Sequence, residues 1–306
     1  MTANLRVVDA HYPADFERLR AVREPVFVIE QHCPIEEEWD ALDAPSAHAL
    51  VLNERDEPVA TGRLTPDHKI GRMAVLADYR GSGVGALIME HLIAKARALG
   101  YPELALSSQV HAIPFYERFG FIADGPEYPD ANIPHRMMYR PLPATSPTGL
   151  IQFDRAAAAR VTAMDLMRAA RHRIGIASHS LDAELFDHDA VIALIKRVAM
   201  SGRGARIQIL VEDITTAVQN SHRLVGLAQR LSSLVEVRRA NRRADPEFGP
   251  AVVLSDHGGW LRRPDPTRFE GEACLDDRPR AREMWLSFDR SWERAEPESA
   301  VRALKL

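Results

Sequence analysis

Residues 78–89 read Asp78-Tyr79-Arg80-Gly81-Ser82-Gly83-Val84-Gly85-Ala86-Leu87-Ile88-Met89. An apolar run from Ile70 to Leu76 precedes this segment, and a pattern typical of a long helix follows it from Val84 to Leu99. Glycines let a backbone approach a phosphate closely, and the first N–H groups of a helix point at an anion bound there. The segment therefore predicts a strand-to-helix turn that holds a phosphorylated ligand, with Arg80 adding a fixed positive charge.

Two common phosphate-binding motifs do not fit this turn. The dinucleotide fingerprint G-x-G-x-x-G lacks its third glycine, and Val84-Gly85-Ala86 cannot supply the Gly-Lys-Ser/Thr ending of a Walker motif. The spacing Arg80-x-x-Gly83-x-Gly85 resembles instead the R/Q-x-x-G-x-G/A motif of acetyltransferases that bind acetyl-CoA. For this motif taken alone, an ordinary strand-to-helix turn remains the alternative.

A second motif follows in the order and at a spacing plausible for that group of enzymes. Residues 112–121 read Ala112-Ile113-Pro114-Phe115-Tyr116-Glu117-Arg118-Phe119-Gly120-Phe121, which resembles the A-I-x-F-Y-x-x-x-G-F segment of GNAT (GCN5-related) N-acetyltransferases. Other segments resemble the ElaA-like branch of the family: 26–34, 62–66, 70–72, 107–111 and 133–135. The resemblance covers roughly residues 1–142. It implies an α/β GNAT fold, a mixed sheet with flanking helices.

The same resemblance assigns elements and cofactor contacts. A helix near 14–24 and strands near 48–53 and 59–65 fit the usual GNAT order. The co-substrate is acetyl-CoA, and no metal is expected. Backbone N–H groups of the turn, together with the side chain of Arg80, are the candidates for its pyrophosphate. These turn residues are Gly81, Ser82, Gly83, Val84, Gly85 and Ala86.

The pantetheine arm is expected beside a splayed strand, here Arg72 to Val75. Met73 and Val75 contribute through their backbones, and the N–H of Val75 is expected near the thioester oxygen, where negative charge develops. Gln109 stands where many relatives have an asparagine that bonds the pantetheine. Tyr116 matches the tyrosine that protonates the departing coenzyme A thiolate. A core tyrosine beside Phe115 is the alternative.

The residue that removes the proton of the amine is less clear from the sequence. Glu127, after the strand at Phe121-Ile122, is one candidate for a general base, and Glu30 is another. His111 and His135 lie within family-like segments and are candidates to hold the substrate or move a proton. For each of the four, an ordinary surface or structural role is the alternative. An acidic segment at 36–40 would attract a cationic amine or simply face solvent.

The whole chain favours two domains. At 306 residues it exceeds one typical domain, and the proline-rich segment at 143–150 predicts a linker between residues 1–142 and 151–306. Residues 1–142 carry 14 Lys and Arg against 21 Asp and Glu, a net charge of −7, and residues 143–306 carry 25 against 22, a net of +3. A net of +3 does not indicate a nucleic-acid-binding domain.

Composition sets further expectations. It indicates a soluble cytoplasmic protein with no signal peptide and no membrane span. Cys33 and Cys274 lie in different halves, which favours reduced thiols over a disulfide. A homo-oligomer is left open.

Residues 151–306 predict a second α/β domain. Helices are expected at 155–172, 189–200, 222–231 and 281–292, and strands at 173–178, 206–211, 235–238 and 251–254. This alternation predicts a sheet that is largely parallel, at least at first. The layout resembles one phospholipase D unit, but the nearest match to its H-x-K-x(4)-D motif, at His257, has Gly259 at the lysine and Pro264 at the aspartate. A domain of that fold would lack its phosphodiester chemistry.

Taken together, the sequence predicts an N-acetyltransferase that moves an acetyl group from acetyl-CoA to a primary amine. The amine attacks directly in a ternary complex, because Cys33 lies in no nucleophile motif. The amine belongs to a small molecule, a peptide or a protein. The second domain has a regulatory, binding or oligomerising role. Two alternatives remain: a non-catalytic acyl-CoA sensor that signals through the second domain, and a phosphodiesterase or nucleic-acid-binding protein based on that domain. The basic run at 238–243 is the only support for nucleic acid, and a solvated loop explains it as well.

Overall fold

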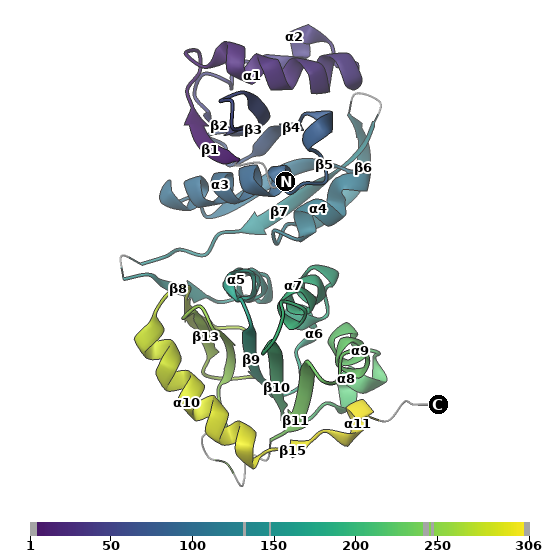
Figure 1. Ribbon diagram of the computed structural model, residues 1–306, viewed down its shortest axis with the longest axis vertical. Helices are drawn as coiled ribbons and strands as arrows, with labels where there is room; N and C mark the ends of the chain where they lie inside the picture. The colour runs from purple at the N-terminus through teal and green to yellow at the C-terminus, as the bar shows by residue number, and fades with distance from the viewer. Residues whose placement is uncertain (1–4, 131–132, 147, 241–244, 246–247, 303–306) are drawn as a thin grey trace. The chain divides into compact units, whose positions relative to one another are not determined.

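The computed structural model describes residues 5–130, 133–146, 148–240, 245 and 248–302. The chain divides into two compact units, Met1–Leu142 and Pro143–Leu306, which are considered separately (Figure 1). Among the helices in these ranges, none combines the length and apolar character that a membrane span requires.

The first unit contains two antiparallel sheets. One has the strand order β1-β2-β3-β4 and the other the order β5-β7-β6. The strands of the first sheet are β1 (Arg6–Ala10), β2 (Ala47–Leu52), β3 (Pro58–Leu64) and β4 (Ile70–Val75). Those of the second are β5 (Glu103–Gln109), β6 (Ile122–Asp130) and β7 (Ile133–Pro141).

The two sheets meet where β4 and β5 run parallel and touch at one end only. Lys69, just before β4, forms an isolated parallel bridge with Ala105, whose N–H donates to the carbonyl of His68 at 3.0 Å. Beyond this point β4 pairs only with β3, and β5 pairs only with β7. The facing edges of β4 and β5 therefore diverge into a fork, which is the splayed arrangement that the GNAT resemblance predicts.

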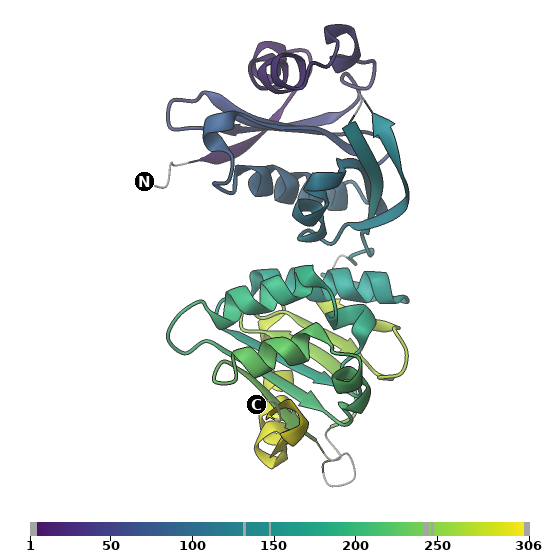
Figure 2. The ribbon, with the colours of Figure 1, turned by 90° about the vertical axis from the view of Figure 1, so that its right-hand side faces the viewer.

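Helices cover both faces of the first sheet (Figures 1 and 2). On one face lie α1 (Phe16–Arg23), the π-helical segment η1 (Glu24–Glu30) and α2 (Ile35–Glu38), and on the other lies α3 (Val84–Ala98). The short helix α4 (Ile113–Glu117) packs instead against β5 and β6 of the second sheet. Short 3₁₀ turns, η2 (Ala77–Tyr79) and η3 (Val110–Ala112), follow β4 and β5. The expected helix at 14–24 and the strands at 48–53 and 59–65 are confirmed within a few residues.

One glycine explains how α3 approaches the sheet so closely. A Cβ atom at Gly62 of β3 would come within 2.6 Å of Ile88 and 2.9 Å of Leu92, both on α3, and 2.7 Å from the sulfur of Met73. No side chain fits there without displacing the helix. Ile88 and Leu92 are buried with Met89 in the main core of this unit.

The second unit is built on an eight-stranded sheet with the order β15-β11-β10-β9-β12-β13-β14-β8. The strands β9 (Arg173–Ser178), β10 (Arg206–Val211) and β11 (Val235–Arg239) are parallel. The antiparallel ones are β8 (Leu150–Phe153), β12 (Ala251–Ser255), β13 (Trp260–Arg263), β14 (Gly271–Cys274) and β15 (Glu296–Pro297). The sequence predicted β9 to β12 and missed the shorter β8, β13, β14 and β15.

A single helix covers one face of this sheet, α10 (Arg278–Arg294), and several cover the other (Figures 1 and 2). Those are α5 (Ala156–Ala169), α6 (Ala183–Phe186), α7 (Asp189–Ala199), α8 (Thr215–Gln219), α9 (Arg223–Arg230) and α11 (Ser299–Arg302). The segment expected as a linker is partly built into this unit, because Leu150 begins β8 and Thr145 forms a bridge with Ile151.

Two sequence features of the second unit have structural explanations. His257 lies in the turn between β12 and β13, and a Cβ atom at Gly259 would lie 2.4 Å from Leu166 and 2.8 Å from the carbonyl of Leu275. A lysine therefore has no room at that position. In the basic run, Arg238 lies over the Trp292 ring at 4.5 Å and bonds Glu236, while residues 241–243 are outside the described ranges.

Candidate active site

The fork between β4 and β5 opens into a cavity of about 360 Å³. Four residues expected at the site from the sequence line it: Met73 from β4, Gln109 from β5, Tyr116 from α4 and His135 from β7. Gln109 and His135 are direct partners in the β5–β7 ladder, which explains their proximity. Segments far apart in the chain thus converge on one pocket.

The glycine-rich turn adopts the conformation expected of a phosphate-binding turn. Gly81 and Gly83 have φ of 74° and 89°, a region that favours glycine. Gly83 is the N-cap of α3 and has no side chain to accept the N–H groups of the first turn. The third glycine of the turn, Gly85, faces the ring of Phe115, which lies 3.4 Å from the position of a Cβ atom. The N-terminus of α3 therefore keeps backbone donors for an anion.

Arg80 and Glu30, which the sequence assigns to different ligands, form an ion pair. Both terminal nitrogens of Arg80 donate to the Glu30 carboxylate, at 2.8 and 2.7 Å, while its Nε donates to the carbonyl of Val75 at 3.0 Å. The hydrogen bond from Arg80 lowers the pKa of Glu30. A carboxylate with a lowered pKa is a weaker proton acceptor, which argues against Glu30 as the base. A bound pyrophosphate would share the Arg80 guanidinium with the Glu30 carboxylate, or displace that carboxylate from it.

A β-bulge shapes the β4 side of the fork. The register with β3 shifts so that Arg72 and Met73 together oppose Gly62. Arg72 has φ of 51°, which a non-glycine side chain rarely adopts. Its guanidinium holds this conformation by donating to the carbonyls of Glu38 (3.0 Å) and Glu37 (2.9 Å) and to the carboxylate of Asp40 (3.0 Å). The bulge turns the β4 backbone at the point expected to face the pantetheine.

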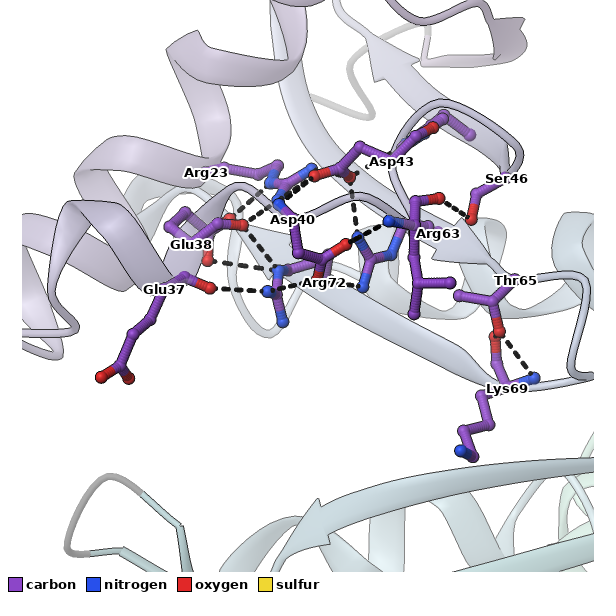
Figure 3. A network of polar contacts seen from close by, with 12 residues as sticks. Arg23, Glu37, Glu38, Asp40, Asp43, Ser46, Arg63, Thr65, Lys69 and Arg72 are labelled. Carbon is purple, nitrogen blue, oxygen red and sulfur yellow. Dashed lines mark hydrogen bonds and ion pairs between the residues drawn. The ribbon is translucent and has the colours of Figure 1, made fainter.

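Arg72 belongs to a cluster of three arginines and three carboxylates (Figure 3). The carboxylate of Asp43 is its centre, because it accepts from Arg23 at 2.7 Å and from Arg63 at 2.9 Å. Asp40 accepts from Arg63 at 2.7 Å, and Glu38 accepts from Arg23. Arg23 and Asp43 are fully buried. The cluster ties α1, the segment after α2, β3 and the β4 bulge together behind the cavity.

Tyr116 is poised as a proton donor rather than an anion. Burial raises the pKa of its phenol to about 12. Its ring packs edge-on against Phe115 and Phe121, at 5.0 and 6.2 Å between centroids, and its hydroxyl has no hydrogen-bond partner among the described residues. At neutral pH it therefore presents a protonated hydroxyl group at the cavity.

A backbone carbonyl fixes the tautomer that the neutral ring of His135 adopts. Its Nδ1 lies 2.8 Å from the carbonyl oxygen of Ile133. A carbonyl oxygen can only accept, so Nδ1 carries the hydrogen, and Nε2 of the neutral ring then keeps its lone pair. The ring is largely buried, stacks on Tyr128 at 6.3 Å and lines the cavity. Nε2 is thus a proton acceptor held in a fixed orientation.

Other expected residues do not line this cavity: Val75, Glu30, the turn at 80–86, Glu127 and His111. Glu127 is an exposed carboxylate on β6, and His111 is exposed in η3; neither is among the lining residues. Further lining residues include Cys33 and Asp130, which the sequence did not single out as ligands, and Glu38 from the acidic segment at 36–40. Burial, together with the carboxylates of Glu38 and Glu37, raises the pKa of the Cys33 thiol. Their positions in the sequence did not indicate a shared pocket, because Cys33 lies between η1 and α2 whereas Asp130 ends β6, far away in the chain.

The two units match different families of known proteins. A family model described as an acetyltransferase (GNAT) domain matches residues 20–141, and one described as a domain of unknown function matches residues 155–304. An uncharacterized N-acetyltransferase of Bacillus subtilis, YjcF, is 39% identical over 123 residues, which span 39% of this chain and 87% of YjcF.

Solved structures that match the first part of the chain include two at similar identity. An acyl-CoA N-acyltransferase from Pseudomonas aeruginosa is 31% identical, with a TM-score of 0.41, and covers 45% of this chain and 99% of its own. Escherichia coli ElaA is 30% identical, with a TM-score of 0.41, and covers 44% of this chain and 99% of its own. The identity to YjcF and the family match at residues 20–141 confirm the prediction from the motifs: through its first unit, the chain belongs to the GNAT acetyltransferase family.

Proposed function

We propose that the first unit transfers an acetyl group from acetyl-CoA to a primary amine, by direct attack in a ternary complex. The observation that carries this proposal is the cavity at the fork. Tyr116 and His135 line it together, one with a protonated hydroxyl group and the other with a basic ring nitrogen. Acyl transfer to an amine needs both, because the amine loses a proton and the thiolate gains one.

The residues present fit acetyl-CoA. The open N-terminus of α3 and the side chain of Arg80 suit its pyrophosphate. The edge of β4 that faces the fork has no strand partner along Arg72 to Val75 in the described part of the chain, so it can pair with the pantetheine amides. When bound, the co-substrate supplies an activated thioester. The N–H of Val75 is proposed to stabilise its carbonyl oxygen, and Gln109 to bond the pantetheine.

The acceptor is proposed to be cationic in solution. Glu38 and Asp130 place carboxylates on the cavity wall. Arg23 and Arg72 largely neutralise Glu38, whereas Asp130 is exposed and has no ion-pair partner among the described residues. A carboxylate at the entrance attracts an ammonium group, which must then lose its proton before it can attack.

His135, rather than Glu127, is proposed as the base that takes this proton. Replacing His135 with asparagine keeps an amide N–H for the Ile133 carbonyl but removes the ring lone pair. We expect kcat/KM at pH 7 to fall by about 10²-fold. The loss should shrink as the pH rises towards the amine pKa of about 10, because the neutral amine then forms without help. Steady-state kinetics from pH 6.5 to about 10 would measure this.

Glu127→Gln is the matched control, because it also removes a proton acceptor of the second sheet, but one outside the cavity lining. We expect its pH profile to match that of the wild type. The base would be Glu127 instead if Glu127→Gln lowered kcat/KM by about 10²-fold at pH 7, with a loss that shrinks at high pH. In that case His135→Asn would show no such pH-dependent loss.

The function itself is tested by measuring coenzyme A release from acetyl-CoA across an amine panel. The panel contains polyamines, amino acids, aminoglycosides and peptides, and mass spectrometry identifies the product. We expect release that depends on one class of amine and forms its N-acetyl derivative. Tight binding of acetyl-CoA without turnover on any amine would favour a non-catalytic acyl-CoA sensor.

A further inference from the structure

The second unit contains a cavity that the acetyltransferase chemistry does not use. It lies between the sheet and α10, at the carboxyl ends of two parallel strands, and Ala177 of β9 and Leu210 of β10 line it together with Val252 of β12. Chain direction changes there, since β9 is parallel to β10 and antiparallel to β12. In open α/β sheets, ligands commonly bind near the carboxyl ends of the strands.

The walls of this cavity are largely apolar and its volume is small. Phe248, Met284 and Phe288 face the three strand residues, and the cavity holds about 170 Å³. An engineered cavity of roughly 150 Å³ accommodates benzene. A ligand with a hydrocarbon part of about six to eight carbon atoms therefore fits, whereas a nucleotide or coenzyme A is too large.

Cationic side chains mark one side of the cavity. Arg262 and Arg280 line it, and no carboxylate does so among the described residues. Each arginine has an acidic neighbour on the surface, Glu272 at 3.8 Å from Arg262 and Glu283 at 3.0 Å from Arg280. These side chains are about one-third to two-thirds exposed, and such pairs are weak. Both guanidinium groups can therefore turn to an anion in the cavity.

A buried hydroxyl group points to the same kind of ligand. Ser291 of α10 is only 4% exposed and lines the cavity, so its hydroxyl group can donate to a ligand oxygen there. The cavity thus combines apolar walls, which suit the hydrocarbon part of a ligand, with hydrogen-bond donors for an anionic head group.

We propose that this cavity binds a small organic carboxylate with an apolar body, of the size of benzoate or hexanoate. The planar guanidinium groups of Arg262 and Arg280 match the planar geometry of a carboxylate. The apolar strand and helix residues take up the hydrocarbon part. This binding is independent of acyl transfer in the first unit and gives the second unit a ligand of its own.

Calorimetric titration of the full chain with benzoate, hexanoate and the neutral analogue hexanamide tests this proposal. We expect saturable binding of at least one of the two acids, and binding of hexanamide at least about tenfold weaker than that of hexanoate, because hydrogen bonds to charged groups are the stronger ones. The comparison of acid and amide uses the unaltered protein, so it does not depend on the folding of any variant.

Three variants locate the site. Arg262→Gln and Arg280→Gln should each weaken acid binding by about tenfold. Arg282→Gln, an exposed arginine of the same helix that does not line the cavity, should leave it unchanged. Absence of binding by both acids at millimolar concentration would overturn the proposal. Equal affinity for hexanoate and hexanamide would also overturn it. So would a loss of acid binding in Arg282→Gln as large as that in Arg262→Gln and Arg280→Gln.

Discussion

Replacing Tyr116 with phenylalanine is expected to lower kcat by on the order of 10²- to 10⁴-fold, the usual effect of removing a general acid. Burial raises the pKa of this phenol to about 12, so its hydroxyl is protonated throughout the neutral range. Phenylalanine keeps the ring that packs against Phe115 and Phe121 and removes only the hydroxyl oxygen at the cavity. Steady-state kcat with saturating acetyl-CoA and amine measures the effect.

The affinity for acetyl-CoA separates this role from a structural one. Since the turn at 80–86 is untouched, the Kd for acetyl-CoA should change less than about threefold, and the thermal midpoint should stay near that of the wild type. An unchanged kcat would mean that solvent or another group protonates the thiolate. A parallel loss of kcat and of coenzyme binding would instead mean that Tyr116 mainly packs the fork.

Replacing Asp43 with asparagine is expected to destabilise the first unit by about 3–5 kcal/mol, the cost of leaving buried charges without their partner. The side chain is isosteric, but Arg23 and Arg63 would lose their shared carboxylate, at 2.7 and 2.9 Å. Burial alone would raise the pKa of Asp43, but hydrogen bonds from Arg23 and from the backbone of Asp40 lower it overall. The carboxylate is therefore charged at neutral pH, where its pairing stabilises the fold.

Urea unfolding of the variant and the wild type at several pH values would measure this effect. A carboxylate whose pKa is lowered by folding stabilises the protein above its unfolded pKa of about 4, and this contribution is lost as the pH falls further. The difference between the two proteins should thus be largest near pH 7 and shrink below about pH 4. Asp56→Asn is the control, because Asp56 forms an exposed ion pair with Arg6 and should not move the midpoint. Equal midpoints for Asp43→Asn and the wild type would show that the cluster is dispensable.

The sequence predicted those parts of the molecule that local patterns encode. The turn at 80–86 and the segment at 112–121 were recognisable because their glycines and aromatics occur at fixed spacing, and together they predicted the fork. Apolar runs likewise predicted β9 to β12 of the second unit. The short hairpin strands β13 and β14 were missed, since four residues are too few to establish an alternating pattern.

The parts that the sequence could not predict depend on contacts between distant segments. The pairing of Arg80 with Glu30 joins residues fifty positions apart, and it argues against the expected role of Glu30 as a base. The tautomer of His135 depends on one carbonyl, that of Ile133. The cluster around Asp43 consists of charged residues that a sequence pattern would place on the surface, because only the fold reveals that they neutralise one another.

The most direct test of direct acyl transfer at the fork is the intact mass of the protein during turnover. Cys33 lines the cavity, so a covalent route through its thiol is the specific competitor, although burial and nearby carboxylates raise its pKa and disfavour the nucleophilic thiolate. In samples quenched with acetyl-CoA and amine present, we predict acetylated amine, protein without an added acetyl group, and unchanged turnover in the Cys33→Ser variant. Protein acetylated at Cys33 that passes its acetyl group to added amine, together with loss of turnover in Cys33→Ser, would contradict direct transfer.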